Sequence, residues 1–279
     1  MSDTLQHPKE SGHWYSSDGK WIETVTGKNG KERAPTLRDA RIYGYVPGAT
    51  TILKVAARPG LEKWKRDQIL MSALTLPKIK NEPLDNFAER IQQDANEQSK
   101  KAREKGTAIH AAIQEYFQKD KDECWDEWIE KYNNYNKETE ATVKLIDFDI
   151  GGQDWKVEQT FSSPLGYGGK VDLYSDDVII DFKTKEFDET ADVKKMAYDT
   201  NGMQLAAYKR GVWPSFGKGL YDCDKHKEEF NNIKLVNIFI STKVPGLVLM
   251  YEWENPERLW KMFRSLLDYY KLKNNFMEV

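Results

Sequence analysis

Hydrophobic positions recur along this chain with two periods, and each period predicts one kind of element. Alternating or continuous short apolar runs between turn residues predict β-strands. Apolar positions three and four residues apart predict amphipathic helices, and Asn255-Pro256 is a typical helix start. The predicted strands are 13–15 and 20–23 (a short hairpin), 143–148, 155–161, 166–174, 178–184, 233–241 and 247–253; the predicted helices are 61–74, about 86–119, a short one within 120–140 around Trp125, Trp128 and Tyr132, about 201–212, and one from 255.

The strands 166–174 and 178–184 flank a short acidic turn and predict a β-hairpin. Side chains alternate across a strand, so Asp181 and Lys183 share one face of it. If the turn is the two-residue connection Asp176-Asp177, then Asp172 lies directly opposite Asp181. A three-residue turn shifts this pairing by one position and still leaves the two carboxylates close.

Two carboxylates that face each other across a hairpin repel, and a divalent cation turns that repulsion into a binding site. Oxygen ligands of this kind suit Mg²⁺ or Mn²⁺. Lys183 would lie beside the metal, where it could orient or deprotonate a water, or neutralise charge on a phosphate. An ordinary surface hairpin is the alternative. The apolar run Val178-Ile179-Ile180 speaks against it, because charges at the end of a buried strand need partners.

Composition narrows the class of protein. Charged residues make up 31% of the 279 residues and hydrophobic ones 39%, which is typical of a folded chain. The net charge of −3 means that any DNA contact must come from local basic patches. The two cysteines, Cys124 and Cys223, lie far apart, which argues against a zinc site or a disulfide framework. The chain shows no signal peptide and no apolar run near the ~18 residues that span a bilayer, so we expect a cytoplasmic protein without a membrane partner.

Five sequence motifs lie between about residues 100 and 210. They are Gly106-Thr107-Ala108-Ile109-His110, Glu158, Gly169-Lys170-Val171-Asp172, Asp181-Phe182-Lys183-Thr184 and Gln204-Leu205-Ala206-Ala207-Tyr208. Together these motifs resemble the PD-(D/E)xK nuclease superfamily, and most closely its RecB-type exonuclease branch, which includes phage exonucleases. Their joint occurrence in the family's order is more specific than any one of them. The proline that precedes the first aspartate in the family pattern is missing.

The resemblance implies roles for individual residues. Asp172, Asp181, Lys183 and Glu158 would be catalytic. The metal, Mg²⁺ with Mn²⁺ as a substitute, would be held by Asp172, Asp181, the backbone carbonyl of Phe182, His110 and, through water, Glu158. On general grounds alone, His110 is more often a hydrogen-bonded core residue, and Glu158 a solvated one. The residues expected to contact DNA are Gln204, Tyr208, Thr184, Lys170, Arg103 and Lys105.

The expected fold class is α/β (α+β): a mixed central β-sheet flanked by helices, with a restriction-endonuclease-like core at residues 86–279. Residues 1–85 would form an N-terminal hairpin and helical extension. The expected function is a Mg²⁺-dependent deoxyribonuclease that degrades DNA from its ends, with single strands as one candidate substrate, in DNA recombination or replication. If the chain is of phage origin, it would act in the host cytoplasm. A structure-specific endonuclease and an inactive nucleic-acid-binding module remain the alternatives, and polarity and oligomeric state stay open.

Overall fold

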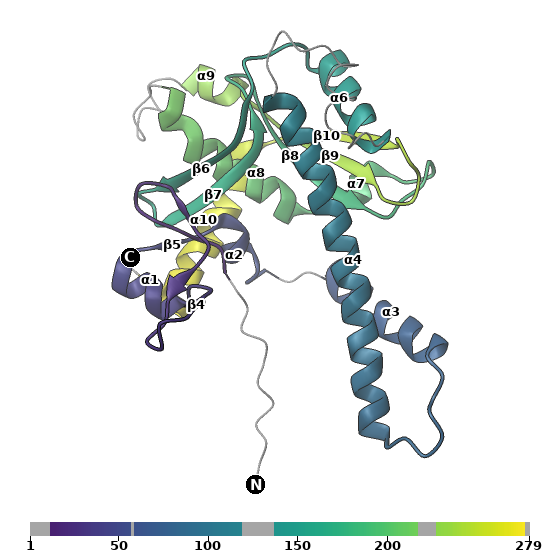
Figure 1. The fold of residues 1–279 in the computed structure, drawn as a ribbon. Coiled ribbons are helices and arrows are strands. Elements are labelled where there is room, and N and C mark those ends of the chain that lie inside the picture. Colours follow the sequence, from purple (N-terminus) through teal and green to yellow (C-terminus); the bar gives the residue numbers. More distant parts are fainter. Residues whose placement is uncertain (1–11, 57–58, 119–136, 217–226, 277–279) are drawn as a thin grey trace.

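A five-stranded mixed sheet forms the centre of the molecule (Figure 1). The computed structural model describes residues 12–56, 59–118, 137–216 and 227–276. The strand order is β10-β9-β8-β7-β6, in which β8 and β9 are parallel and the other neighbours antiparallel. This confirms the expected α/β class with a mixed sheet. The strands are β6 (Lys156–Ser163), β7 (Tyr167–Tyr174), β8 (Val178–Lys185), β9 (Lys234–Ser241) and β10 (Val248–Glu252).

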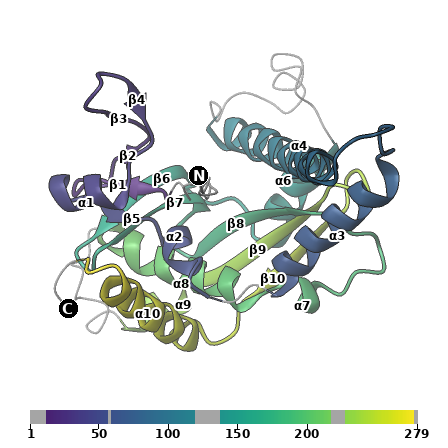
Figure 2. The same cartoon turned by 90° about the horizontal axis from the view of Figure 1, so that it is seen from below.

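Helices α4 (Leu84–Gln118) and α6 (Lys137–Asp149) cover one face of the sheet (Figure 2). Between these helices and the sheet lies a hydrophobic cluster. In it, Ile109, Ile113 and Ile146 of the helices join Leu173 and Ile238 of the sheet, and all five are nearly fully buried. Burying such side chains stabilises the fold by about 1.5–3 kcal/mol each. The long helix α4 is confirmed almost to the residue.

Helix α8 (Asp199–Val212) covers the other face, and α10 (Pro256–Lys273) packs on α8. Parallel neighbours need a crossover connection, and α8 lies in the one that joins β8 to β9. The approach of α8 is close because Gly211 has no side chain: a Cβ there would lie 2.0 Å from the ring of Phe161. Asn255 caps α10 by accepting a hydrogen bond from the Arg258 amide at 3.1 Å, as the Asn-Pro pair predicted. The crossover also contains α7 (Val193–Met196), η1 (Trp213–Phe216) and α9 (Lys227–Asn232).

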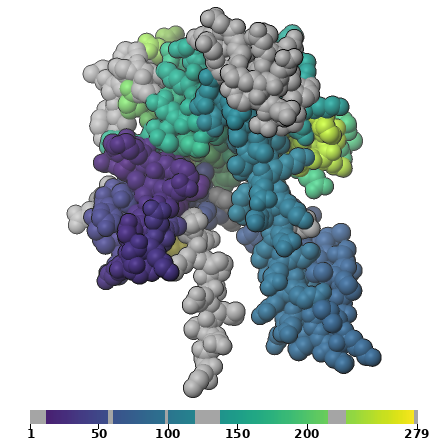
Figure 3. Space-filling view, viewed as in Figure 1, coloured from purple at the N-terminus to yellow at the C-terminus, as the bar shows by residue number. Residues whose placement is uncertain are grey.

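The N-terminal part packs beside β7 and α8. Strand β1 (Trp14–Tyr15) pairs with β2 (Trp21–Ile22), which confirms the predicted hairpin, and also with β5 (Val46–Pro47). Helix α2 (Ala49–Leu53) contacts α8, α10 and β7. Helix α3 (Pro59–Thr75) packs on α4 instead, and Figure 3 shows this pair projecting from the body. The remaining elements are β3 (Val25–Thr26), β4 (Glu32–Arg33) and α1 (Leu37–Tyr43).

The strand predicted at 143–148 is wrong, because these residues belong to helix α6. Thr139, Thr142, Val143 and Ile146 are buried at helical spacing, whereas Phe148 is exposed. Packing of this stripe on the sheet outweighs the β-propensity of the run. The predicted helix around Trp125 lies outside the described residues. No helix in the described part of the chain is long and apolar enough to cross a membrane.

Candidate functional site

The hairpin of β7 and β8 has the register expected for a two-residue turn. Leu173 pairs with Ile180 and Tyr174 with Ile179, and the Ser175 amide donates to the Val178 carbonyl at 2.9 Å. The ladder ends there. At the next position, the Phe182 amide donates to Oδ2 of Asp172 at 2.9 Å, so a carboxylate takes the place of a backbone carbonyl. The two strands therefore part where Asp172 and Asp181 would otherwise pair.

The Asp181 carboxylate is almost fully buried, at 2% exposed, and three side chains donate to it. Gln204 Nε2 donates to Oδ1 at 2.7 Å. Oδ2 accepts from Asn237 Nδ2 at 2.7 Å and lies 2.7 Å from the Lys183 ammonium. Charge-assisted hydrogen bonds of this kind are the strong ones. Asp181 is thus fixed in one position by the protein alone.

Asn237 on β9 is the site residue that sequence reasoning missed. It lies beside Asp181 in the parallel register of β8 and β9, and its Nδ2 also donates to the Asp181 carbonyl at 3.0 Å. Its Oδ1 accepts from Trp253 Nε1 at 2.7 Å, which fixes the orientation of the amide. The signal in the sequence is a lone asparagine within the apolar run Leu235–Ile240, since a buried amide needs polar partners.

Helix α8 brings Gln204 and Tyr208 to the same site, on one helix face as their spacing predicted. Gln204 Oε1 accepts from the Lys183 ammonium at 3.2 Å, and its Nε2 donates to the Tyr208 hydroxyl at 2.9 Å. Burial, and then the nearby Asp181 charge, raises the pKa of Tyr208 far above its ordinary value. The phenol therefore stays protonated, and Gln204 links Asp181, Lys183 and Tyr208 into one hydrogen-bonded group.

Helix α4 approaches β8 closely at Gly106, where a Cβ would lie 2.6 Å from Thr184 Oγ1. This contact explains the glycine of the first motif and accounts for Thr184, which packs against the helix. One turn later, His110 Nδ1 lies 3.7 Å from Asp172 Oδ2, and its ring meets that of Phe182 edge-on. Burial lowers the pKa of His110 to about 4, so the imidazole is neutral near pH 7 and can act as a ligand.

Asp172 is held very differently from Asp181. Burial, and then the charge of Asp181, raises the pKa of the Asp172 carboxyl to about 7. Its side chain is 15% exposed and borders one small recess together with His110, Glu158 and Phe182. The mutual repulsion of two such carboxylates would be relieved by a cation bound between them.

Glu158 lies at the same recess in a strained backbone conformation. Its φ is +53°, and its pairing with Asp172 is missing from an otherwise continuous β6–β7 ladder. A non-glycine residue in this region costs on the order of 1 kcal/mol, and such strain clusters at functional sites. The Glu158 carboxylate forms an ion pair with Lys170. The structure thus places two of the expected residues in contact with each other.

The two cations expected on α4 differ in their surroundings. Lys105 donates to the Thr242 carbonyl at 2.8 Å and lies 3.8 Å from Glu138, so its ammonium is engaged within the protein. Arg103 is exposed on the helix surface. Within the described residues, neither Arg103 nor Lys105 forms a hydrogen bond or ion pair with the carboxylate site, although both belong to the helix that carries His110.

The donor set fits a divalent cation in its chemistry. Asp172 and a neutral His110 are neighbours, and Asp181 and the Phe182 backbone follow on β8. The arrangement is nevertheless incomplete. Within the described residues, no group of three or more His, Cys, Asp or Glu side chains is arranged to hold a metal ion. Both oxygens of Asp181 accept from protein donors, Oδ1 from one and Oδ2 from two, so a metal would compete with these donors for the carboxylate.

Comparison with known proteins adds no family to this description. No family model and no curated protein matches the chain. A solved structure described as "Crystal structure of SSO0001" is 12% identical to it, with a TM-score of 0.24, over 59% of this chain and 86% of its own. A likeness at that level says nothing of fold or function.

Proposed function

We propose that this chain is a divalent-metal-dependent nuclease that hydrolyses phosphodiester bonds in DNA from the ends of the strand. The observation that carries the proposal is the junction of β7 and β8. There Asp172, with its pKa raised to about 7 by burial and by Asp181, lies 3.7 Å from the neutral imidazole of His110. The neighbouring Asp181 carboxylate pairs with the Lys183 ammonium at 2.7 Å. Acids with strongly perturbed pKa values next to a specific partner are typical of active sites. The resemblance of the motifs to RecB-type nucleases points the same way.

In the proposed mechanism, different residues would bind the metal, neutralise charge on the phosphate and position the lysine. Asp172, Asp181, His110 and the Phe182 carbonyl would hold Mg²⁺ or Mn²⁺, and Glu158 would act through water. The bound cation would supply Lewis-acid activation of the phosphate and lower the pKa of a water. Lys183 would neutralise charge that builds on the phosphate, or take the proton of the attacking water. Gln204 would keep Lys183 in place, because its Oε1 already accepts from that ammonium at 3.2 Å.

The test is cleavage of end-labelled single- and double-stranded DNA with Mg²⁺ by the wild type, Asp181→Ala and Lys183→Met. We expect each variant to lose cleavage by about 10²–10³-fold, the usual cost of one electrostatic group in an active site. Lys234→Met is the matched control, because Lys234 lies on the adjacent strand β9 and is 60% exposed. Undiminished cleavage by Lys183→Met or Asp181→Ala would remove the mechanism.

The mode of attack needs a second comparison, between linear DNA and circular DNA of the same sequence. An exonuclease degrades the linear form and leaves the circle intact. Cleavage of the circle would instead support a structure-specific endonuclease with the same site. Labels at the 5′ and 3′ ends of the linear form then give the polarity.

A specific observation supports a second candidate, a nucleic-acid-binding module without chemistry. Asp181 accepts from Gln204, Asn237 and Lys183, and these three donors would compete with a metal for the carboxylate. This candidate predicts that the wild type binds DNA equally well in EDTA and in Mg²⁺ and cleaves none of it. Cleavage that begins on adding Mg²⁺ and stops with EDTA would exclude it.

A further inference from the structure

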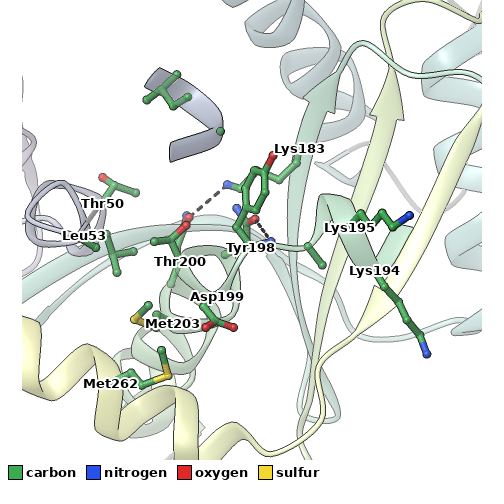
Figure 4. Close-up of a pocket in the computed structure, with 16 residues that line it drawn as sticks. Thr50, Leu53, Lys183, Lys194, Lys195, Tyr198, Asp199, Thr200, Met203 and Met262 are labelled. Atoms are coloured by element: carbon green, nitrogen blue, oxygen red, sulfur yellow. Dashed lines mark hydrogen bonds between the residues drawn. The ribbon is translucent and has the colours of Figure 1, made fainter. Parts of the chain in front are cut away.

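A cavity of about 770 Å³ lies directly beside Lys183 and Gln204, on the α8 side of the site (Figure 4). Its walls come from α2, the start of α3, α7 and the segment that follows it, the first turns of α8, and α10. Small-molecule sites in proteins have volumes of about 300–1,000 Å³. The cavity is therefore large enough for a ligand that also reaches Lys183. Its apolar lining includes Leu53, Met203 and Met262.

Tyr198 is one of the residues that line this cavity (Figure 4). It precedes the first residue of α8, and its amide donates to Asn201 Oδ1 at 3.1 Å, which fixes the backbone there. The Lys185 ammonium lies 4.2 Å from the centre of its ring, yet 50% of the residue's surface is exposed. An aromatic ring that is held in place and left half exposed is a stacking platform for a planar ligand.

The charges around the cavity set the orientation of such a ligand. Lys183 lies on the side of the carboxylates, and its ammonium would attract a phosphate. Asp199 begins α8, so its carboxylate opposes a phosphate at that helix end. Lys194 and Lys195 are directed away from Tyr198 (Figure 4). A nucleotide would therefore turn its phosphate toward Lys183 and its base toward Tyr198 and Met262.

We propose that this cavity holds one unpaired nucleotide of the DNA strand, next to the phosphate at Lys183, with its base stacked on Tyr198. The base is taken to be unpaired because both faces of an internal base are covered by its neighbours in a duplex, so such a base can stack on Tyr198 only after it leaves the stack. The inference deepens the proposed function, on which it rests for the identity of the ligand as DNA. It adds the residues that would receive the base.

The first test measures binding of a short single-stranded oligonucleotide in EDTA, where no cleavage occurs. Base–aromatic stacking contributes an amount equivalent to about 5- to 150-fold in affinity. We expect Tyr198→Ala to weaken binding by a factor in that range and Tyr198→Phe to bind within about twofold of the wild type. The salt dependence should be unchanged, because no phosphate contact is removed.

Tyr269→Ala is the matched control. Tyr269 lies on α10, is 52% exposed, and has the Lys273 ammonium 5.9 Å from the centre of its ring, so it reproduces the exposure and the cationic neighbour of Tyr198. Its removal should leave binding unchanged. Equal affinities of the wild type and a folded Tyr198→Ala, as judged by circular dichroism, would overturn the inference. Equal losses from Tyr198→Ala and Tyr269→Ala would do so as well.

A second test moves a single abasic nucleotide along the oligonucleotide. The wild type should lose affinity when the abasic position occupies the cavity, and Tyr198→Ala should lose this dependence, as in a double-mutant cycle. Position-dependent loss that persists in Tyr198→Ala contradicts the subsite. If binding depends on Tyr198 while no metal condition yields cleavage, the subsite stands and the nuclease function fails. If cleavage occurs without any dependence of binding on Tyr198, the function stands and the subsite fails.

Discussion

The two sides of the site treat their carboxylates in opposite ways. On the α8 side, Asp181 accepts from Gln204, Asn237 and Lys183 and is fully compensated. On the α4 side, Asp172 meets a neutral His110 and the charge of Asp181, and its pKa is raised to about 7. The charge of Asp181 is thus stabilised by its hydrogen-bond donors, whereas the charge of Asp172 is electrostatically unfavourable. This difference indicates that a bound cation would bring most electrostatic stabilisation at Asp172, while Asp181 is held in place by the protein.

The largest expected effect comes from making the same substitution on both sides. Asp181→Asn replaces one carboxylate oxygen by an NH₂ group, which cannot accept a hydrogen bond. At least one of the donors Gln204, Asn237 and Lys183 then loses its acceptor. We expect Asp181→Asn to lower the free energy of unfolding by roughly 3 kcal/mol. Asp172→Asn removes a buried charge that Asp181 repels, so it should be at least as stable as the wild type. The measurement is urea unfolding at pH 8 in EDTA. Equal losses in the free energy of unfolding in the two variants would mean that the two carboxylates are not stabilised differently.

A smaller loss of stability is expected at Asn237, and it measures how much this amide contributes to holding Asp181. Asn237→Ala removes a donor from Asp181 and leaves the Trp253 indole without its acceptor, so we expect a loss of about 2 kcal/mol in the free energy of unfolding. Trp253→Phe keeps the ring and removes only the indole donor, at a cost of about 1 kcal/mol. If Asn237→Ala unfolds at the same urea concentration as the wild type, the amide does not hold Asp181.

The smallest effect is the pH dependence of stability, because two groups oppose each other. Asp172 has a folded pKa of about 7 against an ordinary 3.8, so the folded state binds the extra proton and stability falls as pH rises from about 4 to 7. His110 has a folded pKa of about 4 against 6.5, so the unfolded state binds the extra proton and stability rises between pH 4 and 6.5.

The variants separate these two contributions in thermal unfolding across that pH range. Asp172→Asn should gain stability relative to the wild type as pH rises from about 4 to 7. His110→Asn should gain relative to the wild type as pH falls from 6.5 to 4. Parallel curves for all three proteins would mean that neither group titrates abnormally in the folded state.

Local patterns predicted much of the fold and part of the site. The acidic turn predicted the hairpin with two possible registers, of which the structure has the two-residue one, and the spacing of Gln204 and Tyr208 placed both on one face of α8. These features depend on neighbours within a few residues. Gly106 is interpretable only with the structure, since its reason is the approach of α4 to Thr184, almost 80 positions later in the chain.

What the sequence could not supply depends on long-range packing. Asn237 meets Asp181 through a parallel register that joins strands on either side of the α8 crossover, and no local pattern sets that register. The residues 143–148 form a helix because their buried stripe fits the sheet, against their own β-propensity. The cavity at Tyr198 is formed by α2, α3, α7, α8 and α10, which come from distant parts of the sequence, so no local pattern predicts it.

The central claim is that Asp172 and Asp181 form a cation site, and Mn²⁺ binding tests it most directly. The measurement is titration of Mn²⁺ by electron paramagnetic resonance at pH 7 with the wild type and Asp172→Asn. The account predicts that the wild type binds Mn²⁺ and releases protons as Asp172 ionises, and that Asp172→Asn binds at least tenfold more weakly. Equal Mn²⁺ binding by the two proteins, or none by the wild type, would contradict it.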